Sequence, residues 1–257
     1  MSEPQLEPWL DGRPAEGRAF AAVFPHSDDL SIFAAGLVRK LVLEGRTGYF
    51  IKITNDDKDS YDLSVGETVR RIEVETEQVA ASLGLAKVYC FNYPNHYLEA
   101  SHLVEIRHRL ITLFRFLRID TVITFDPWGH YEENPDHTLT GTAVEAACWM
   151  AGRRLDLPEL ADLGLVPRAV LHKYYVARGP QLVNRVVDVT RVLADKRNAL
   201  RLHRTPMHRM WQEHLAETAK TVSPDEFVET FLELDDHGRH LERFHHVGPR
   251  TSEKGIG

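Results

Sequence analysis

Residues 19–29 read AFAAVFPHSDD, an unbroken apolar run that ends in proline, histidine, serine and two aspartates. An apolar run of this length, bounded by a turn signal, is typical of a strand that is buried on both faces. Adjacent carboxylates repel each other, and His26, Asp28 and Asp29 do not suit a hydrophobic core. The stretch therefore predicts a buried strand with a polar site at its end.

The alternation of strand-like and helix-like runs continues from this stretch along the rest of the chain. Strands are predicted at 19–24, 47–54, 87–91 and 120–125, with helices at 30–44, 67–83, 102–117 and 138–152. Further strands are predicted near 169–177 and 185–189, and further helices near 192–203, 207–219 and 224–234. This rhythm indicates βαβ units. We predict a single α/β domain with a mainly parallel, Rossmann-like twisted sheet flanked by helices.

The two ends of the chain look different from this middle. Residues 1–18 are acidic and contain proline, and they lack the basic and apolar regions of a signal peptide. Residues 237–257 are rich in histidine and charge and are predicted to be a partly disordered tail, with His245 and His246 exposed to solvent. We therefore expect an N-terminal extension at 1–18, one domain at 19–236 and a C-terminal tail.

The composition excludes several classes of protein. The net charge is -7, with 31 basic and 38 acidic residues, which does not favour a nucleic-acid-binding surface. The two cysteines, Cys90 and Cys148, form no C-x-x-C pair and fit a reducing compartment. No apolar run is long enough to span a membrane. We expect a soluble cytoplasmic protein; the sequence leaves its oligomeric state open, a homo-oligomer included.

Polar loops follow each of the first four predicted strands. After the PHSDD turn they read NDDKDSYD (55–62), NYPNHYLEASH (92–102) and DPWGHYEENPDH (126–137). In parallel sheets, ligands bind at the loops that follow the carboxyl ends of the strands. We therefore expect these four loops to form one pocket at a single edge of the sheet.

His26, Asp29 and His137 have the ligand chemistry of a catalytic zinc site, which keeps three protein ligands and one water. Asp28 would then lie beside the metal, placed to accept a proton from that water. The H-S-D-D turn alone has another reading, because aspartate at a helix start also caps free backbone amides. The second histidine, after the fourth strand, favours the metal site over a plain cap.

Four motifs in order resemble those of the PIG-L/LmbE family of zinc-dependent N-deacetylases. PHSDD and NPDHTLTG resemble its two metal motifs. RIEVE (71–75) followed by AASLG (80–84) resembles an R-x-x-x-E helix, and the segment from Asp188 to His203 resembles a late D-V-T…K…A-L…H motif. The resemblance covers roughly residues 19–203 and implies that 19–236 is a deacetylase domain of this family.

The resemblance implies a role for each matching residue. His26, Asp29 and His137 would bind one zinc, or another divalent ion such as iron, per chain. Asp28 would be the general base, and Asp136 would support the histidines or handle protons. Arg71 would contact the substrate, with Arg70 as the alternative register; the other reading of this arginine is a solvated helix face.

One position departs from the family pattern. Several relatives carry a histidine three residues before the second metal histidine, and this chain has Asn134 there. An amide can donate a hydrogen bond to an oxyanion but cannot deliver a proton. His130 could take over that task or be a surface histidine, and Tyr131 is a further candidate donor.

Three more polar residues are candidates for the substrate pocket. Asn55 and Asp56 follow the second strand and Asn95 follows the third, although such clusters are often plain turns. His96 is equally ambiguous. His203 could reach the site, but a packing role is favoured.

These residues predict a metal-dependent hydrolase that removes an N-acetyl group from an N-acetylglucosamine-type or related small amide. Two alternatives stay open. A two-metal phosphoesterase could use Asp56, Asp57, Asp59 and Asp126. A non-catalytic sugar-binding protein on the same fold would not need Asp28 beside a complete ligand set.

Overall fold

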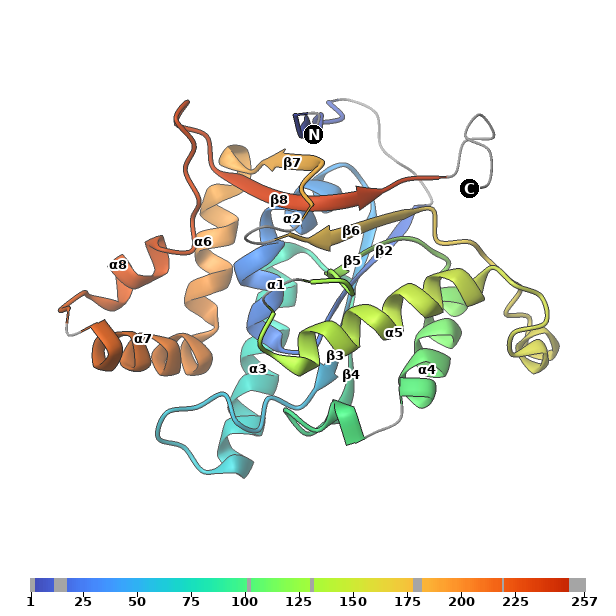
Figure 1. The fold of residues 1–257 in the computed structure, drawn as a ribbon, viewed down its shortest axis with the longest axis horizontal. Coiled ribbons are helices and arrows are strands. Elements are labelled where there is room, and N and C mark those ends of the chain that lie inside the picture. The colour runs from blue at the N-terminus through green and yellow to red at the C-terminus, as the bar shows by residue number, and fades with distance from the viewer. Residues whose placement is uncertain are drawn as a thin grey trace.

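An eight-stranded sheet runs through the middle of the computed structural model, which describes residues 3–11, 18–100, 103–129, 132–177, 182–218 and 220–249 (Figure 1). Across the sheet the strand order is β1-β7-β8-β6-β5-β2-β3-β4. The strands are β1 (Gln5–Leu6), β2 (Ala19–Phe24), β3 (Thr47–Thr54), β4 (Lys87–Tyr93), β5 (Ile119–Phe125), β6 (His172–Val176), β7 (Arg185–Asp188) and β8 (Leu241–Val247). Only β8 runs antiparallel to its neighbours, β6 and β7. The predicted mainly parallel sheet is confirmed.

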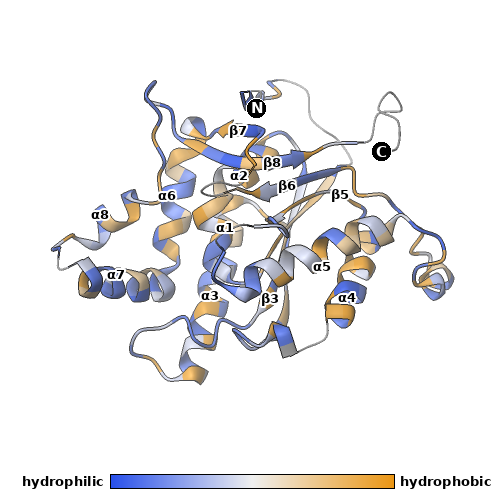
Figure 2. Ribbon diagram, in the orientation of Figure 1, coloured by the Kyte–Doolittle hydropathy of each residue, from blue (hydrophilic) through white to orange (hydrophobic). Residues whose placement is uncertain are grey.

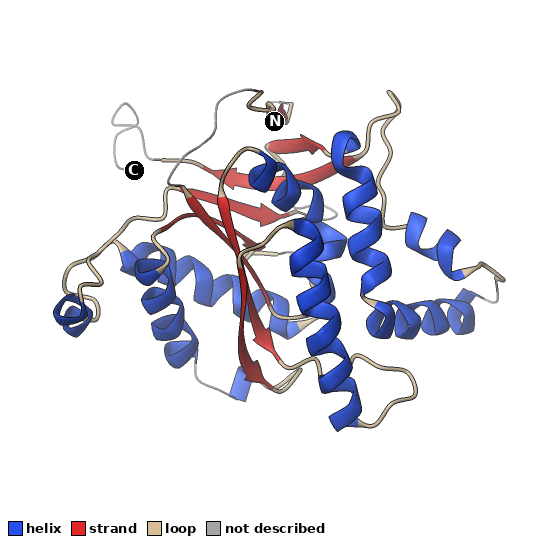
Figure 3. Ribbon diagram, turned by 180° about the vertical axis from the view of Figure 1, so that it is seen from behind, coloured by secondary structure: helices blue, strands red, loops and turns tan. Residues whose placement is uncertain are grey.

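Helices cover both faces of this sheet (Figure 3). They are α1 (Ser27–Phe33), α2 (Ala35–Leu43), α3 (Val65–Leu83), α4 (Leu103–Phe116), α5 (Pro135–Ala151), α6 (Leu193–Leu202), α7 (Arg204–Thr218) and α8 (Pro224–Glu229). Short 3₁₀ helices lie at Leu98–Ala100, Pro158–Leu163 and Thr190–Val192. Along the helices, hydrophobic and hydrophilic residues alternate in Figure 2, as expected where one side packs on the sheet. No helix of the described ranges combines the length and apolarity that a membrane crossing requires.

The first strand of the predicted domain, β2, has both of its faces buried. Phe20, Ala22 and Phe24 pack into a core with α1, α2, α3 and α6, whereas Ala21 and Val23 pack into a second core with α4 and α5. Successive side chains of a strand point to opposite faces. A strand buried on both sides must therefore be apolar throughout, which explains the unbroken run AFAAVF.

The strand order reverses at β2. The chain passes from β2 to β3 and β4 on one side and then returns to place β5 on the other side of β2. In open α/β sheets this reversal opens a crevice at the carboxyl ends of the two central strands. The polar turns after β2 and β5 meet there.

Two predicted helices have different boundaries in the structure. The helix predicted at 30–44 is two helices, because Ala34 leaves the helical conformation (φ −143°, ψ 4°) between α1 and α2. The helix predicted at 138–152 begins at Pro135, so Asp136 and His137 lie in its first turn. Because α1 begins at Ser27 and α5 at Pro135, both before the predicted starts, the polar turn residues lie on helix starts rather than in open loops.

The predicted terminal segments also contribute strands. Part of the predicted N-terminal extension forms β1, which pairs with β7. β8 lies inside the predicted tail, so the boundary at 237 is wrong. Its sequence does not predict a buried strand, because a buried carboxylate, Glu242, interrupts the apolar residues Leu241 and Phe244.

The prediction that His245 and His246 are solvent-exposed is also wrong, because both are half-buried on β8. His246 stacks on His172 with ring centroids 5.5 Å apart. Burial, with the charge of Arg185 next, lowers the pKa of His246 to about 4. These rings are therefore part of the sheet surface.

Glu242 is held by a buried network that joins β8 to two helices. Its Oε1 accepts from Lys196 Nζ (2.7 Å) and from the backbone N–H of Gly36 (2.9 Å), and its Oε2 accepts from Leu37 N (2.8 Å). The Lys196 and Glu242 side chains are 4% and 2% exposed. This network fastens α6, the start of α2 and β8 together.

Replacing Lys196 with methionine should lower the free energy of unfolding by about 3–5 kcal/mol, because the Glu242 carboxylate is left buried without its cation. Urea denaturation followed by circular dichroism measures this change. Arg197→Met is the matched control: its ion pair with Glu229 is partly exposed and should contribute less than about 1 kcal/mol. Equal losses in both variants would contradict the assigned role of the buried pair.

Candidate metal centre

The turn between β2 and α1 holds His26 and Asp29 beside each other. His26 is extended (φ −109°, ψ 161°) and directly precedes the helix. Its backbone N–H donates to Asp29 Oδ2 over 3.0 Å. The capping role expected of an H-S-D-D turn is therefore present, and the same bond fixes the two side chains against each other.

The start of α5 brings in the second histidine. Asn134 caps the helix by accepting from the N–H of Asp136 (3.0 Å), and Pro135 occupies the first turn. The ring of His137 stacks on Phe125 of β5 with centroids 3.9 Å apart. A Cβ at Gly141 would lie 2.6 Å from the carbonyl oxygen of Phe125, so only glycine lets α5 pack this closely against the end of β5.

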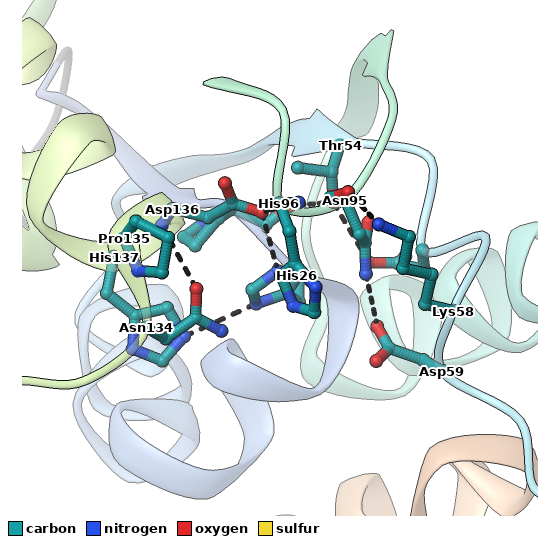
Figure 4. Close-up of polar contacts among 12 residues, drawn as sticks. His26, Thr54, Lys58, Asp59, Asn95, His96, Asn134, Pro135, Asp136 and His137 are labelled. Atoms are coloured by element: carbon teal, nitrogen blue, oxygen red, sulfur yellow. Dashed lines mark hydrogen bonds and ion pairs between the residues drawn. The ribbon is translucent and has the colours of Figure 1, made fainter. Parts of the chain in front are cut away.

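Three donor groups converge where these two turns meet. Figure 4 shows the two histidines of this cluster, His26 and His137. His26 Nδ1 lies 3.2 Å from Asp29 Oδ2 and 3.3 Å from His137 Nε2, and His137 Nε2 lies 3.4 Å from Asp29 Oδ1. All three residues are buried. The structure thus brings together the three residues that the sequence predicted as metal ligands.

The spacing of this cluster fits a tetrahedral metal ion. Zinc binds nitrogen and oxygen at about 2.0–2.1 Å, which places tetrahedral ligand atoms about 3.3–3.4 Å apart. The three separations match that spacing. Two imidazole nitrogens that face each other beside a carboxylate also suit a cation, because only one proton can lie between them. The donor set therefore fits zinc.

Each histidine has a carboxylate at its other nitrogen. His26 Nε2 lies 3.3 Å from Asp136 Oδ2, and His137 Nδ1 lies 3.2 Å from Glu132 Oε2, although that second contact is not aligned as a hydrogen bond. A proton on the outer nitrogen leaves the inner one free to bind a metal, and such carboxylates also orient the ring. Glu132 was not among the residues predicted from the sequence.

The electrostatics of the cluster favour an ionised Asp29. Burial alone would raise its pKa, but the charges of His137 and His26 outweigh burial and hold the pKa below its ordinary range. Burial likewise would lower the pKa of His26, and the carboxylates of Asp29 and Asp136 raise it well above its usual value. The pocket therefore stabilises a carboxylate next to positive charge.

Asp28 lies in the same turn as Asp29, but its environment shifts its pKa in the opposite direction. It is 6% exposed. Burial, followed by the charges of Asp29 and Asp59, raises the pKa of Asp28 well above its ordinary value. Neighbouring carboxylates whose pKa values are pushed apart are typical of acid–base sites.

Two predicted substrate residues are buried instead of lining the pocket. Asp56, in a left-handed conformation (φ 58°), binds Lys52 Nζ and accepts from the N–H of Ser27 (3.3 Å). Asn95 donates to Asp59 Oδ2 over 3.1 Å. Both are 0% exposed, so the structure gives the plain-turn reading of Asp56 and Asn95, and a contact with substrate stays a prediction. Both support the turns around the site.

Asn55 is half-buried in the same turn. Its Oδ1 accepts from the N–H of Asp57 over 3.2 Å. Its predicted contact with substrate stays a prediction.

The carboxylates of the alternative two-metal site do not form a cluster. Asp57 accepts from the N–H of Asn95, and Asp126 accepts from the N–H of Trp128. Within the described part of the chain, every group able to hold a metal contains His26. This arrangement does not favour the phosphoesterase.

Arg209 is a residue that sequence reasoning missed. It extends from α7, and its Nη2 lies 3.5 Å from Asp59 Oδ1. Its charge also acts on Asp28. Burial and Asp56 raise the pKa of Asp59 to about 6 despite this cation. No local motif marks Arg209, because α7 reaches the site only through the tertiary fold.

Glu75, in the R-x-x-x-E motif, explains how α7 is positioned. Its carboxylate accepts from the N–H (3.0 Å) and the hydroxyl (2.9 Å) of Thr205 at the start of that helix. Arg71 points to the surface, pairs with Glu67 at 2.6 Å and is 56% exposed at its side chain. It lines a cavity of about 780 Å³ together with Arg70 and Arg204. The structure thus gives the solvated-face reading of Arg71, and a substrate contact stays a prediction.

The remaining predicted residues divide into two groups. His130 and Tyr131 lie outside the described residues. His203 is completely buried, in agreement with the favoured packing role, and burial, followed by the charge of Lys52, lowers its pKa to about 3.

Comparison with known proteins agrees with this geometry. Residues 21–148 match the family model described as PIG-L, GlcNAc-PI de-N-acetylase. The matched range contains both metal motifs. The chain belongs to the PIG-L/LmbE family.

One curated relative and one solved structure are similar to this chain over most of its length. Diacetylchitobiose deacetylase of Thermococcus kodakarensis is 27% identical over 200 residues, which cover 74% of this chain and 72% of the relative. The structure of N,N'-diacetylchitobiose deacetylase from Pyrococcus horikoshii superposes with a TM-score of 0.77 at 25% identity, covering 93% of this chain and 87% of that one.

A third structure has the same fold and a different reaction. It is GalB, the 4-carboxy-2-hydroxymuconate hydratase of Pseudomonas putida, with a TM-score of 0.67 at 16% identity over 93% of this chain and 100% of that one. The PIG-L/LmbE fold alone therefore does not fix the reaction, and the site must decide it.

Proposed function

We propose that this protein is a zinc-dependent N-deacetylase that acts on an N-acetylglucosamine-type small molecule. One arrangement carries the proposal: three buried donors lie at tetrahedral spacing, and a fourth carboxylate, Asp28, is adjacent and has a raised pKa. The deacetylase activities named for the relatives from Thermococcus and Pyrococcus support the choice of reaction and of substrate class.

His26, Asp29 and His137 would hold the ion. Zinc bound there would supply a Lewis acid for the acetyl carbonyl and would lower the pKa of water. Asp136 would accept a hydrogen bond from His26 Nε2–H, which would leave Nδ1 of His26 free to bind the ion. Glu132 faces Nδ1 of His137 in the same way.

Asp28 would be the general base. It accepts a proton from the attacking water, and its raised pKa suits both this step and the return of the proton to the leaving amine. Asp29 cannot share this role while it is a ligand with a lowered pKa. The two adjacent aspartates would thus have distinct tasks.

Asn134 would stabilise the oxyanion. Its Oδ1 is occupied by the cap of α5, which leaves the Nδ2 group as a donor. An amide cannot supply a proton, so Asp28 would deliver the proton to the amine unless His130 does so. Tyr131 is a second candidate donor on the same loop.

A screen of N-acetylated compounds for acetate release tests this function. N-acetylglucosamine and N,N'-diacetylchitobiose are incubated with zinc-loaded protein, with chelated protein and with chelated protein to which zinc is restored. We expect acetate from at least one compound, loss of activity on chelation and recovery with zinc.

Two controls sharpen the screen. A phosphate monoester should not be hydrolysed, because among the described residues the carboxylates of the two-metal alternative form no group of three metal-binding side chains. If folded, zinc-loaded protein releases no acetate from any N-acetyl sugar, the proposed function is wrong.

A further inference from the structure

A cavity of about 780 Å³ lies between α3, α7 and the loop that precedes α3. The two helices pack against each other (Figure 1). The described lining residues lie within 60–78 and 204–208, and the three proposed metal ligands are not among them. Ser60 directly follows Asp59 and His208 directly precedes Arg209, so the Asp59–Arg209 ion pair lies next to the cavity. The cavity is therefore a neighbour of the proposed zinc site and not a part of it.

Three arginines from the two helices line this cavity. Arg70 and Arg71 come from α3, and Arg204 comes from the start of α7. Arg71 is neutralised by Glu67, whose Oε1 lies 2.6 Å from its Nη2. Among the residues that the structure describes, Arg70 and Arg204 form no ion pair with a carboxylate. Two guanidinium groups in the cavity are therefore without a counter-ion.

The acidic side chains of the cavity are largely committed to other partners. Glu75 uses one carboxylate oxygen to accept from the N–H of Thr205 (3.0 Å) and the other to accept from its hydroxyl (2.9 Å). Glu67 is paired with Arg71. The remaining acid, Asp62, is exposed to solvent, where ions and water screen its charge. The cavity can thus present its two unpaired arginines to a ligand.

Both unpaired arginines lie at helix starts, where the helix dipole makes a cation unfavourable. Arg204 is the first residue of α7. Arg70 Nη1 lies 3.6 Å from the position that a Cβ of Gly66 would occupy, so the guanidinium reaches back over the first turn of α3. Ser64, at the N-cap of that helix, makes no side-chain capping hydrogen bond. A bound anion would offset both guanidinium charges and the positive ends of both helices.

We propose that this cavity binds the phosphate group of a small phosphorylated ligand. A phosphate presents more oxygens than a carboxylate, and two planar guanidinium groups can each bind a pair of them. The Ser60 hydroxyl accepts from the N–H of Leu63 (3.1 Å), which leaves its hydrogen free to donate to the same group. The phosphate can belong to the substrate of the proposed reaction or to a separate small molecule. The binding itself does not depend on the proposed deacetylase function.

Isothermal calorimetry with inorganic phosphate, on the full-length zinc-loaded protein, tests this binding. We expect saturable binding that weakens as the salt concentration rises, because salt screens exposed charges. Arg70→Gln and Arg204→Gln should each weaken the binding by about tenfold, the effect of losing one charge-assisted hydrogen bond. Arg154→Gln is the matched control: Arg154 is an exposed arginine between α5 and the 3₁₀ helix at Pro158–Leu163, and its loss should change nothing.

Two further variants test the charge of the cavity and the place of binding. Glu67→Gln releases Arg71 and removes a negative charge, so phosphate should bind about two- to fivefold more tightly. His137→Ala removes a proposed zinc ligand and should leave phosphate binding unchanged. Loss of binding in His137→Ala would place the phosphate at the zinc site and would overturn the proposal.

Acetate release distinguishes the two sources of the phosphate. N-acetylglucosamine is compared with its 1-phosphate and its 6-phosphate, in the unchanged protein and in Arg204→Gln. A lower KM for one phosphorylated sugar, which the variant raises while kcat and the kinetics of N-acetylglucosamine stay the same, would assign the phosphate to the substrate. Equal kinetics of all three sugars, with inorganic phosphate still bound, would assign it to a separate ligand.

Unchanged phosphate affinity in both Arg70→Gln and Arg204→Gln would refute the site, as would the lack of saturable binding of inorganic phosphate and of both phosphorylated sugars. Circular dichroism shows whether each variant is folded. A protein that binds phosphate through these arginines but releases no acetate would contradict the deacetylase function and leave the phosphate site supported.

Discussion

Replacing Asp28 with asparagine should leave the protein folded and zinc-loaded but reduce acetate release by about 10²–10⁴-fold. The amide has nearly the same shape as the carboxylate but cannot accept a proton at neutral pH. Because Asp29 would supply the ligand oxygen in the proposed site, the metal content should stay at that of the unchanged protein. Steady-state kinetics and elemental analysis of the same preparation measure both quantities.

Asp162→Asn is the matched control, since this aspartate is exposed on a 3₁₀ helix away from the metal motifs. Full turnover of Asp28→Asn with its metal in place would exclude Asp28 as the base and leave Asp136 or His130 to carry the proton. Loss of metal from Asp28→Asn would mean that the two aspartates exchange roles. Sugar binding without turnover in the unchanged protein would favour the non-catalytic alternative.

Replacing His137 with alanine should abolish both zinc binding and activity. Even a change in a residue that only supports a ligand costs about 10–100-fold in metal affinity, so the loss of one of three ligands should cost more. The stacking of the ring on Phe125 is lost as well, but α5 keeps its Asn134 cap, so the fold should persist. Elemental analysis and circular dichroism separate these two effects.

His237→Ala serves as the control for this variant, because His237 is an exposed histidine between α8 and β8. Its metal content and activity should be unchanged. Full metal content in the double variant His26→Ala, His137→Ala would show that the ion is bound elsewhere and would refute the assigned ligand set.

The strands around the site could be predicted because local pattern and tertiary role agree there. The run AFAAVF is apolar at every position, since both of its faces are buried, and its sharp end at Pro25 marks the switch point of the sheet. His26 and Asp29 stood out for the same reason, because they are polar at positions where a buried strand has just ended. His137 lies farther on, at the end of the polar connection that follows β5.

Other parts of the site depend on contacts that no local pattern records. Arg209 reaches Asp59 only because Glu75 holds the start of α7 from a helix far away in sequence. Asp56 and Asn95 look like pocket residues in the sequence, yet their side chains are used within the fold by Lys52 and Asp59. Residue type indicated polarity correctly, but not which partner each group would meet.

The place of β8 in the sheet has a consequence for the order in which the chain folds during synthesis. It is the last strand of the described chain, yet it lies between β6 and β7, and β1 is attached through β7. The block β4-β3-β2-β5-β6 can assemble from residues 19–176 as they leave the ribosome. β7 and β1, by contrast, have no neighbour to pair with on that block until residue 247 has emerged. The edge of β6 therefore stays uncovered during synthesis until β8 has emerged. Premature pairing with another chain would begin at this exposed edge.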